Sequence, residues 1–272
     1  MELNKIWNES NEITLKEHLD NNSIDIVLTS PFYNLKDSRT REIGGKCNQV
    51  GKYDEFVDSM TDEEYEKYIL GLFEGFNRVL KPNGVVLWNV SYCATDPSSM
   101  FHCITRIFTE SNFTIGDVIT WKKQSALPFG SPNRLTRITE YIFVFARKSE
   151  INTYKCYGKK SVGFGTGDNA KKEYYTTLYN FIEAKNNDES CELNKATYST
   201  DLCRKLLNIY GQEGITVYDP FMGTGTTALA CKQLGMNYVG SELSAKQCEW
   251  AENRLLIGRG SLDKPHDINM LF

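Results

Sequence analysis

The chain has 272 residues, enough for one large domain or two modest ones with a full hydrophobic core. Hydrophobic residues make up 40% and charged residues 24%, which is ordinary for a soluble globular protein. The formal net charge of −4 argues weakly against nucleic acid as a partner. No apolar run is long enough to cross a membrane and the first residues are polar, so we expect neither a transmembrane helix nor a secretory signal.

Alternating strands and helices are expected along the first half of the chain. Residues 23–28 form a buried apolar strand that ends at Thr29-Ser30-Pro31. Thr61 caps a helix that extends to Leu80, and Glu64 completes a capping box. There follow a turn at 81–84, a strand at 85–88, a helix at 100–111 and strands at 115–121 and 140–146.

The pattern breaks between residues 149 and 194, where Lys, Gly, Asn and Tyr are frequent and no period is evident. An irregular segment of this length is usually functional or disordered. Beyond it we expect a helix at 199–210, a strand at 215–218, a Gly-rich turn, a helix at 225–234, a strand at 237–240, a helix at 244–256 and a tail from Gly258. This alternation indicates an α/β domain with a largely parallel sheet.

Basic residues are concentrated in two stretches despite the acidic total. Residues 121–172 hold eleven Lys or Arg against three Asp or Glu, a local charge of +8, and residues 34–53 have a local charge of +3. Local basic surface matters more than total charge when the partner is a polyanion. The two stretches therefore indicate either a nucleic-acid-binding surface or two solvated loops with spare lysines.

The eight cysteines and three histidines are scattered, and no two cysteines form a Cys-x-x-Cys pair. A zinc site needs clustered ligands, so we expect no metal site. Without an export signal, reduced thiols in a cytoplasmic protein are the default expectation.

The first turn that carries chemistry is Asp219-Pro220-Phe221-Met222-Gly223-Thr224-Gly225-Thr226-Thr227, between a strand and a helix. Its small residues let the backbone approach a ligand closely, and the helix-start N–H groups favour an anion such as a carboxylate. Glu242 ends the next strand, where an acid can accept hydrogen bonds from ribose hydroxyls. The string lacks the Lys-Ser/Thr of a Walker loop and the third glycine of a dinucleotide fingerprint. We expect a ligand with a ribose, and the alternative is a tight turn without a ligand.

The second turn is Thr29-Ser30-Pro31-Phe32-Tyr33-Asn34, at the carboxyl end of a strand, where open α/β sheets bind their ligands. The Ser30 hydroxyl and the Pro31 carbonyl offer acceptors, and Tyr33 offers a flat face. Together they suit a planar ring that bears an amino group. Taken alone, Ser-Pro after a strand is also common turn chemistry.

Together the two turns resemble those of the amino-group DNA methyltransferases, which carry (D/N/S)PP(Y/F/W) for the target amine and D-P-F-x-G-x-G-T for S-adenosylmethionine. In the β class of that family the catalytic motif precedes the cofactor motif, as it does here. The likeness covers most of residues 3–257 and includes Ser23-Ile24-Asp25, 80–84, Trp121-Lys122-Lys123 and Glu140-Tyr141.

The resemblance implies a Rossmann-like methyltransferase fold with a mostly parallel twisted sheet, helices on both faces and a circularly permuted motif order. It assigns residues 1–148 to the catalytic half of the domain and 195–257 to the cofactor-binding half. Residues 149–194 would be a small irregular target-recognition insertion, and 258–272 a C-terminal tail.

The resemblance also implies the site residues, with S-adenosylmethionine as donor, S-adenosylhomocysteine as product and no metal. The catalytic residues are Ser30, Pro31, Phe32 and Tyr33. The cofactor contacts are Asp219, Pro220, Phe221, Gly223, Gly225, Thr226, Glu242, Ser10, Lys195 and Thr197. The DNA contacts are Lys36, Arg39, Arg41, Lys155, Lys159, Lys160, Lys171 and Lys172.

Three departures from the family pattern stand out. Phe32 replaces the second proline of the catalytic motif, which keeps the Pro31 carbonyl but should make the loop less stiff. Ser10 aligns with an acid that usually contacts the cofactor. The segment 195–200 matches only loosely a family block that lines the methionine end of the cofactor.

The implied reaction is methyl transfer to the exocyclic amine of a base flipped out of double-stranded DNA. Hydrogen bonds from the amine to Ser30 and to the Pro31 carbonyl shift electron density back to nitrogen, and Tyr33 or Phe32 stacks on the ring. Methylation at cytosine carbon five needs a Pro-Cys thiolate, which the chain lacks. A Ser at the first motif position resembles cytosine-N4 members more often than adenine-N6 members, so cytosine is favoured and adenine is the alternative.

Two further hypotheses remain open at this point. RNA or protein-glutamine methyltransferases use a similar turn, although they usually place the cofactor motif first. An inactive DNA-binding module is favoured only by Phe32 and by the missing amino-terminal acid. The resemblance is also compatible with a cognate restriction endonuclease as a partner and with a monomer or a homodimer.

Overall fold

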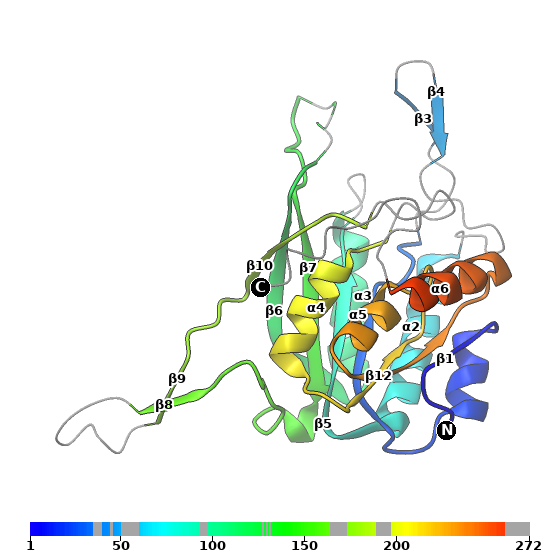
Figure 1. Cartoon of the computed structure of the whole chain (residues 1–272). Helices are drawn as coiled ribbons and strands as arrows, with labels where there is room; N and C mark the ends of the chain where they lie inside the picture. The colour runs from blue at the N-terminus through cyan, green and yellow to red at the C-terminus, as the bar shows by residue number, and fades with distance from the viewer. Residues whose placement is uncertain are drawn as a thin grey trace.

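The computed structural model describes residues 1–34, 40–43, 46–49, 60–92, 97–126, 128, 130, 132–163, 173–188 and 197–258. An eight-stranded sheet with the order β1-β12-β11-β2-β5-β7-β6-β10 lies between two layers of helices (Figure 1). Strand β7 is antiparallel to its neighbours β5 and β6, and the other neighbouring pairs are parallel.

The strands of this sheet are β1 (Lys5–Trp7), β2 (Ile24–Thr29), β5 (Leu80–Val90), β6 (Phe113–Lys123), β7 (Thr139–Arg147), β10 (Phe181–Ala184), β11 (Thr216–Asp219) and β12 (Asn237–Ser241). Two separate hairpins pair β3 (Thr40–Ile43) with β4 (Lys46–Gln49) and β8 (Ser161–Gly163) with β9 (Glu173–Tyr175). The α-helices are α1 (Asn11–Ile13), α2 (Asp62–Val79), α3 (Pro97–Glu110), α4 (Thr200–Tyr210), α5 (Thr226–Gln233) and α6 (Ala245–Ile257). A π-helical segment spans Thr14–His18 and a 3-10 turn spans Lys148–Glu150.

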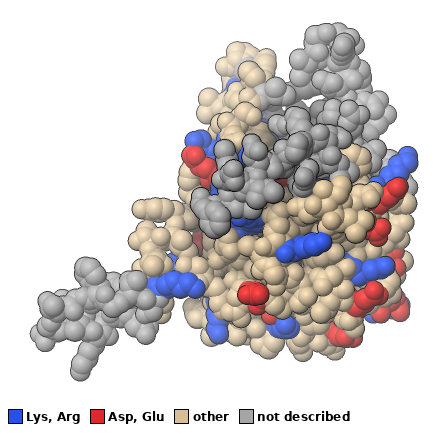
Figure 2. Space-filling view, viewed as in Figure 1, with Lys and Arg blue, Asp and Glu red and all other residues tan. Residues whose placement is uncertain are grey.

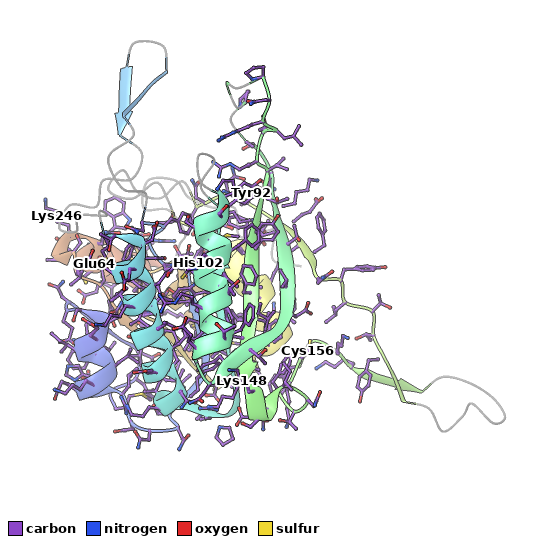
Figure 3. The ribbon with its side chains drawn as sticks, turned by 180° about the vertical axis from the view of Figure 1, so that it is seen from behind. Glu64, Tyr92, His102, Lys148, Cys156 and Lys246 are labelled. Carbon is purple, nitrogen blue, oxygen red and sulfur yellow. The ribbon has the colours of Figure 1, made fainter. Side chains whose placement is uncertain are left out.

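Different parts of the chain cover the two faces of the sheet. Helices α2 and α3 pack on one face, where Phe73 and Phe76 meet Trp88 of β5. Helices α4, α5 and α6 pack on the other face, with β5 contributing Leu87. Figures 1 and 3 show these two helical layers from opposite sides. Because successive strand residues alternate between faces, one apolar run fills both cores. The expected Rossmann-like α/β fold is therefore confirmed.

Helix α2 begins with the capping box that its sequence predicts. The Thr61 hydroxyl accepts a hydrogen bond from Glu64 N at 3.2 Å, and Glu64 Oε2 accepts one from Thr61 N at 2.9 Å. These hydrogen bonds favour the charged carboxylate and lower the pKa of Glu64. The reciprocal pair satisfies two backbone donors that would otherwise lack a partner.

The turn expected at 81–84 is not a boundary between elements, and this expectation was wrong. Strand β5 already begins at Leu80, which pairs with Ile24, and the register shifts before Val85 pairs with Ile26. Asn83 has a φ of 63° within this irregularity. The turn residues thus form a bulge in the strand, which keeps its pairing with β2 on both sides.

Several short elements have no counterpart among the expected ones. Strand β1 pairs with β12, and β10 pairs with β6, so both edges of the sheet come from segments for which no strand was expected. Each has only three or four residues, too few to establish a hydrophobic period. Among the described residues, no helix is long and apolar enough to cross a membrane.

The carboxyl ends of the parallel strands meet at one edge of the sheet, here called the carboxyl edge. Since β7 is antiparallel, its first residues, Thr139 and Glu140, lie at this edge too. The opposite, amino edge holds the beginnings of the parallel strands and the end of β7 at Arg147. This topology gathers side chains from β2, β5, β6, β7 and β11 at one place.

Candidate active site

Asp219, at the end of β11, joins the two turns singled out in the sequence. Its Oδ1 accepts hydrogen bonds from Thr29 Oγ1 at 2.6 Å and Phe221 N at 3.0 Å. Its Oδ2 accepts from Thr227 Oγ1 at 2.6 Å and Tyr198 Oη at 3.0 Å. Burial raises the pKa of this carboxyl, and the four donors act in the opposite direction. Asp219 therefore fixes the turns side by side, and its acceptor positions are occupied by protein groups.

The Gly-rich turn has the backbone that its sequence predicts. Gly223 and Gly225 have φ angles of 53° and 79°, in the left-handed region that favours glycine. Gly225 starts helix α5 so close to α6 that a Cβ there would lie 2.7 Å from the Ala251 Cβ. Thr226 is the first residue of α5, so the turn presents a helix start toward the carboxyl edge.

Glu242 lies directly after β12 and faces the Gly-rich turn. Its Oε2 accepts a hydrogen bond from Gly223 N at 2.8 Å, and its Oε1 accepts one from Ser244 N at 2.9 Å. The Glu242 N–H donates to the Trp7 carbonyl, which attaches this segment to β1. These hydrogen bonds hold the acid against the Gly-rich turn, and its contact with a ribose stays a prediction.

The amino-terminal segment contacts the same turn. Asn11 Nδ2 donates to the Pro220 carbonyl at 3.1 Å and to Tyr68 Oη at 2.8 Å. Ser10 is next to Asn11, but its hydroxyl caps α1 by accepting from Ile13 N at 3.4 Å. Ser10 therefore lies near the cofactor turn with its side chain engaged in a helix cap.

Phe32 packs inward, between the two turns. Its ring is 7% exposed and lies 5.2 Å from Tyr65, 5.9 Å from Tyr68 and 5.9 Å from Phe221, measured between ring centroids. The Phe32 carbonyl also accepts a hydrogen bond from Tyr65 Oη at 2.8 Å. These contacts anchor the loop at the position where the family pattern has a second proline, which offsets the expected loss of stiffness.

A polar network surrounds Ser30. Its Oγ lies 3.2 Å from Tyr33 Oη and accepts a hydrogen bond from Asn89 Nδ2 at 3.3 Å. Asn89 Nδ2 also donates to Glu140 Oε2 at 3.0 Å, and Tyr33 Oη donates to the same oxygen at 3.4 Å. Lys123 forms a salt bridge with Glu140. The network converges on the predicted catalytic hydroxyl from β5, β6 and β7.

Sequence reasoning did not name Thr29, Asn89 or Tyr198 as site residues. Two of them lie at places that the topology rule marks: Thr29 ends β2, and Asn89 lies near the carboxyl end of β5. Lys123 and Glu140 were noted as family landmarks without a role. The sequence could therefore have indicated Thr29 and Asn89 through their positions at strand ends. It could not have indicated the Tyr198 contact, which depends on the tertiary fold.

The remaining predicted contacts are placed as follows. Thr197 is half-buried and precedes Tyr198, whose hydroxyl donates to Asp219. The side chain of Arg41, on β3, is not described. The predicted contacts that lie outside the described residues are Lys36, Arg39, Lys171, Lys172 and Lys195.

Lys155, Lys159 and Lys160 are exposed and are not brought near Ser30. They follow the end of β7, at the amino edge, where Gly158 N donates to the Ile209 carbonyl near the end of α4. The β8–β9 hairpin extends away from the body on this side, and Figure 2 shows basic side chains at its base. DNA contact by these lysines stays a prediction.

Burial also shifts the pKa values of tyrosines and cysteines near this site. Burial, together with the nearby Asp219 charge, raises the pKa of Tyr198 well above its ordinary value, so the phenol stays a donor. Burial likewise raises the pKa of the Cys203 thiol. Within the described part of the chain, no three His, Cys, Asp or Glu side chains are grouped to hold a metal ion.

Comparison with known proteins identifies the family. A sequence model of the N6/N4 DNA methylase family matches residues 24–253, which is most of the chain. The chain is 24% identical over 269 residues to the orphan methyltransferase M.BamHII of Bacillus amyloliquefaciens, covering 89% of this chain and 92% of the relative. It is 27% identical over 261 residues to the type II methyltransferase M.MthZI of Methanothermobacter thermautotrophicus, covering 87% and 72%.

Solved structures show the same fold. The PvuII DNA methyltransferase, described as cytosine-N4-specific, matches with a TM-score of 0.65 and 16% identity over 96% of this chain and 95% of that one. The complex of M1.HpyAVI with S-adenosylmethionine matches with a TM-score of 0.57 and 20% identity over 92% and 98%. The chain belongs to the DNA methylase family of N4 and N6 amino-methyltransferases.

Proposed function

We propose that the protein transfers a methyl group from S-adenosylmethionine to the N4 amine of a cytosine flipped out of double-stranded DNA. Adenine N6 is the alternative target for the same site. The observation that carries the proposal is the pair of hydrogen bonds through which Asp219 joins Thr29 of the catalytic turn to Phe221 of the cofactor turn. A methyl donor on one turn and an amine on the other would then be neighbours, as in-line transfer requires.

The cofactor turn suits S-adenosylmethionine. Backbone N–H groups at the start of α5, near Gly225 and Thr226, favour the carboxylate of its methionine part. Glu242 is proposed to accept from ribose hydroxyls, since a carboxylate that accepts from Gly223 N can still accept further hydrogen bonds. When bound, the donor supplies an activated methyl group on a sulfonium. Phe221, Thr197 and Lys195 are proposed to line the same site.

The catalytic turn suits an aromatic amine. The lone pair of such an amine is delocalised into the ring, so the amine is a poor nucleophile. The Ser30 hydroxyl and the Pro31 carbonyl accept its N–H hydrogen bonds and thereby return electron density to nitrogen. Asn89 and Tyr33 hold the Ser30 hydroxyl in place, and the proton leaves to solvent after transfer.

Cytosine is favoured by the residue type at position 30. A Ser at the first motif position resembles the cytosine-N4 members more often than the adenine-N6 members, which favour Asp or Asn. The fold likeness to the cytosine-N4-specific PvuII enzyme is in keeping with this preference.

We propose that DNA approaches the carboxyl edge. The connection between β6 and β7 projects beyond this edge, as does the β3–β4 hairpin (Figure 3). The connection carries the exposed Arg134 and the 90% exposed Leu135. A cation can meet a backbone phosphate, and an apolar side chain can fill the space that a flipped base leaves. Arg41, on the β3–β4 hairpin, is proposed to add a phosphate contact.

The test compares substitutions of the two serines that flank strand β2. Ser30→Ala removes the acceptor at the carboxyl end of β2, whereas Ser23→Ala alters the segment before its amino end. We expect Ser30→Ala to lose transfer of labelled methyl to unmethylated DNA and to bind S-adenosylmethionine normally. Ser23→Ala should match the wild type in both assays. Full transfer by Ser30→Ala would refute the role assigned to Ser30.

A further inference from the structure

Two buried asparagines beside the catalytic turn have side-chain atoms without hydrogen-bond partners. Asn34 is 9% exposed, and neither its Oδ1 nor its Nδ2 has a partner. Asn89 is 2% exposed, and its Oδ1 has no partner. Among the described residues, the other buried side-chain atoms of this kind are single nitrogen donors of Trp or Arg. The two unpaired acceptors of this set therefore both lie near Ser30, and buried acceptors without a partner need an explanation.

The backbone places both asparagines next to the catalytic turn. Asn34 directly follows Tyr33 and has a φ of 48°, a left-handed conformation that non-glycine residues adopt at a cost in free energy. Asn89 follows Trp88, which is paired with Thr29 in the sheet. Because Thr29 precedes Ser30, the two asparagines flank the Ser30–Tyr33 segment.

The orientation of the Asn89 amide is fixed by charge. Its Nδ2 donates to Glu140 Oε2, and an ionised carboxylate only accepts hydrogen bonds. A flip of the amide would turn Oδ1 toward this carboxylate, which would be repulsive. The Lys123 ammonium holds Glu140 in place from its other oxygen. The Asn89 Oδ1 is thus kept as an acceptor for a donor from outside the protein.

The edge of an amino-bearing base supplies partners for two of the three unpaired atoms, Asn89 Oδ1 and Asn34 Nδ2. Cytosine and adenine both carry an N–H donor on the amine and an acceptor on the adjacent ring nitrogen. We infer that Asn89 Oδ1 shares one amine N–H with its neighbour Ser30 as a bifurcated hydrogen bond, while the Pro31 carbonyl accepts the other N–H, and that Asn34 Nδ2 donates to the ring nitrogen. This inference rests on the proposed function, because it concerns the base in the same site. A carbonyl base would present an oxygen to Asn89 Oδ1 and a ring N–H to Asn34 Nδ2, and both contacts are repulsive.

The experiment starts from a site that the wild type is found to methylate, so failure of the proposed function is detected first. Asn34→Gly removes the amide and suits the positive φ at this position. We expect its kcat/KM for methyl transfer to fall about 10- to 100-fold. The resistance of this variant to urea and its affinity for a duplex with an abasic target should stay unchanged. If Asn34 were merely structural, its substitution would lower the resistance to urea. Asn208→Ala, at an exposed position on α4, is the control and should match the wild type.

A second variant tests the orientation of Asn89. Glu140→Gln removes the charge that keeps the Asn89 amide from flipping. Binding is compared for duplexes whose target base is intact or replaced by its carbonyl analogue, uracil for cytosine or hypoxanthine for adenine. We expect the wild type to prefer the amino base about tenfold or more and the variant to lose most of this preference. Wild-type kcat/KM in Asn34→Gly, or an unchanged preference in Glu140→Gln, would overturn the inference while leaving the proposed function intact.

Discussion

At the scale of single residues, Asp219 is central to the site. A carboxylate buried among apolar strands is costly unless donors surround it, and here Thr29, Phe221, Tyr198 and Thr227 do so. The motif in the sequence located Asp219, but it suggested a ligand contact. Its structural role, which is to hold the two turns together, depends on hydrogen bonds from Thr29 and Tyr198, which are 190 and 21 residues away along the chain. Such long-range partners cannot be predicted from local spacing.

Tyr198→Phe should destabilise the protein by about 1–3 kcal/mol, because it removes a buried donor from Asp219. The variant also loses the contact with Thr227 Oγ1, which lies 2.5 Å from the Tyr198 hydroxyl. Urea unfolding measures the change, with the 77% exposed Tyr179→Phe as the matched control. Equal stability of the two variants would contradict the role given to the Tyr198 hydroxyl.

The raised pKa of Asp219 predicts how stability depends on pH. At pH values between the ordinary pKa of 3.8 and the higher pKa in the folded protein, the folded state keeps the Asp219 carboxyl protonated and the unfolded state does not. The contribution of Asp219 to stability therefore falls as the pH rises from 3.8 to its folded-state pKa, and is constant above it. Asp219→Asn lacks this titration. The difference in unfolding free energy between wild type and variant should decrease with rising pH, and an increase would contradict the assigned shift.

At the scale of elements, long periodic segments were predictable and short edge strands were not. Helix α2 follows from its capping box and apolar spacing, and β11, α5 and β12 follow from the Gly-rich turn between strands. Strands β1 and β10 form only because a neighbouring strand offers a paired edge. The bulge at 81–84 likewise depends on pairing with β2, which the turn residues alone do not reveal.

Two glycines with similar backbone angles, Gly225 and Gly258, allow the cost of backbone strain to be measured apart from the cost of a steric clash. Gly225 and Gly258 have φ angles of 79° and 71°, so alanine at either position has a similar left-handed cost of about 1 kcal/mol. Only Gly225 faces Ala251, whose Cβ would lie 2.7 Å from the new methyl group, whereas nothing lies within 4 Å at Gly258. Gly225→Ala should therefore lose clearly more stability in urea and also bind S-adenosylmethionine less tightly. Matching losses in both variants would rule out the clash.

At the scale of the whole molecule, the sheet separates two basic regions that are close in sequence. The connection between β6 and β7 lies at the carboxyl edge, and Lys155, Lys159 and Lys160 lie at the amino edge. The charge pattern in the sequence located the basic stretches, but it could not tell at which edge of the sheet each one lies. The antiparallel course of β7 decides this. The fold class, by contrast, follows from the order of the elements alone.

Charge removal at the two edges should have different effects on DNA binding. Arg134→Ala should weaken binding of a short duplex. It should also make the slope of the logarithm of the association constant against the logarithm of salt concentration shallower, by about the share of one phosphate contact. The double variant Lys159→Ala/Lys160→Ala should leave short-duplex binding unchanged and weaken only the binding of duplexes long enough to reach the amino edge as well. Fluorescence anisotropy at several salt concentrations makes the comparison. A larger effect of the double variant would place the duplex at the amino edge instead.

The central claim is that the Ser30 turn and the Asp219 turn together methylate a base amine in DNA. The most direct measurement gives the protein labelled S-adenosylmethionine and unmethylated genomic DNA, then identifies the modified nucleoside by mass spectrometry. We expect N4-methylcytosine. N6-methyladenine would keep the site and show that Ser30 does not decide the base. Absence of label in DNA, with S-adenosylmethionine still bound, would contradict the proposed activity.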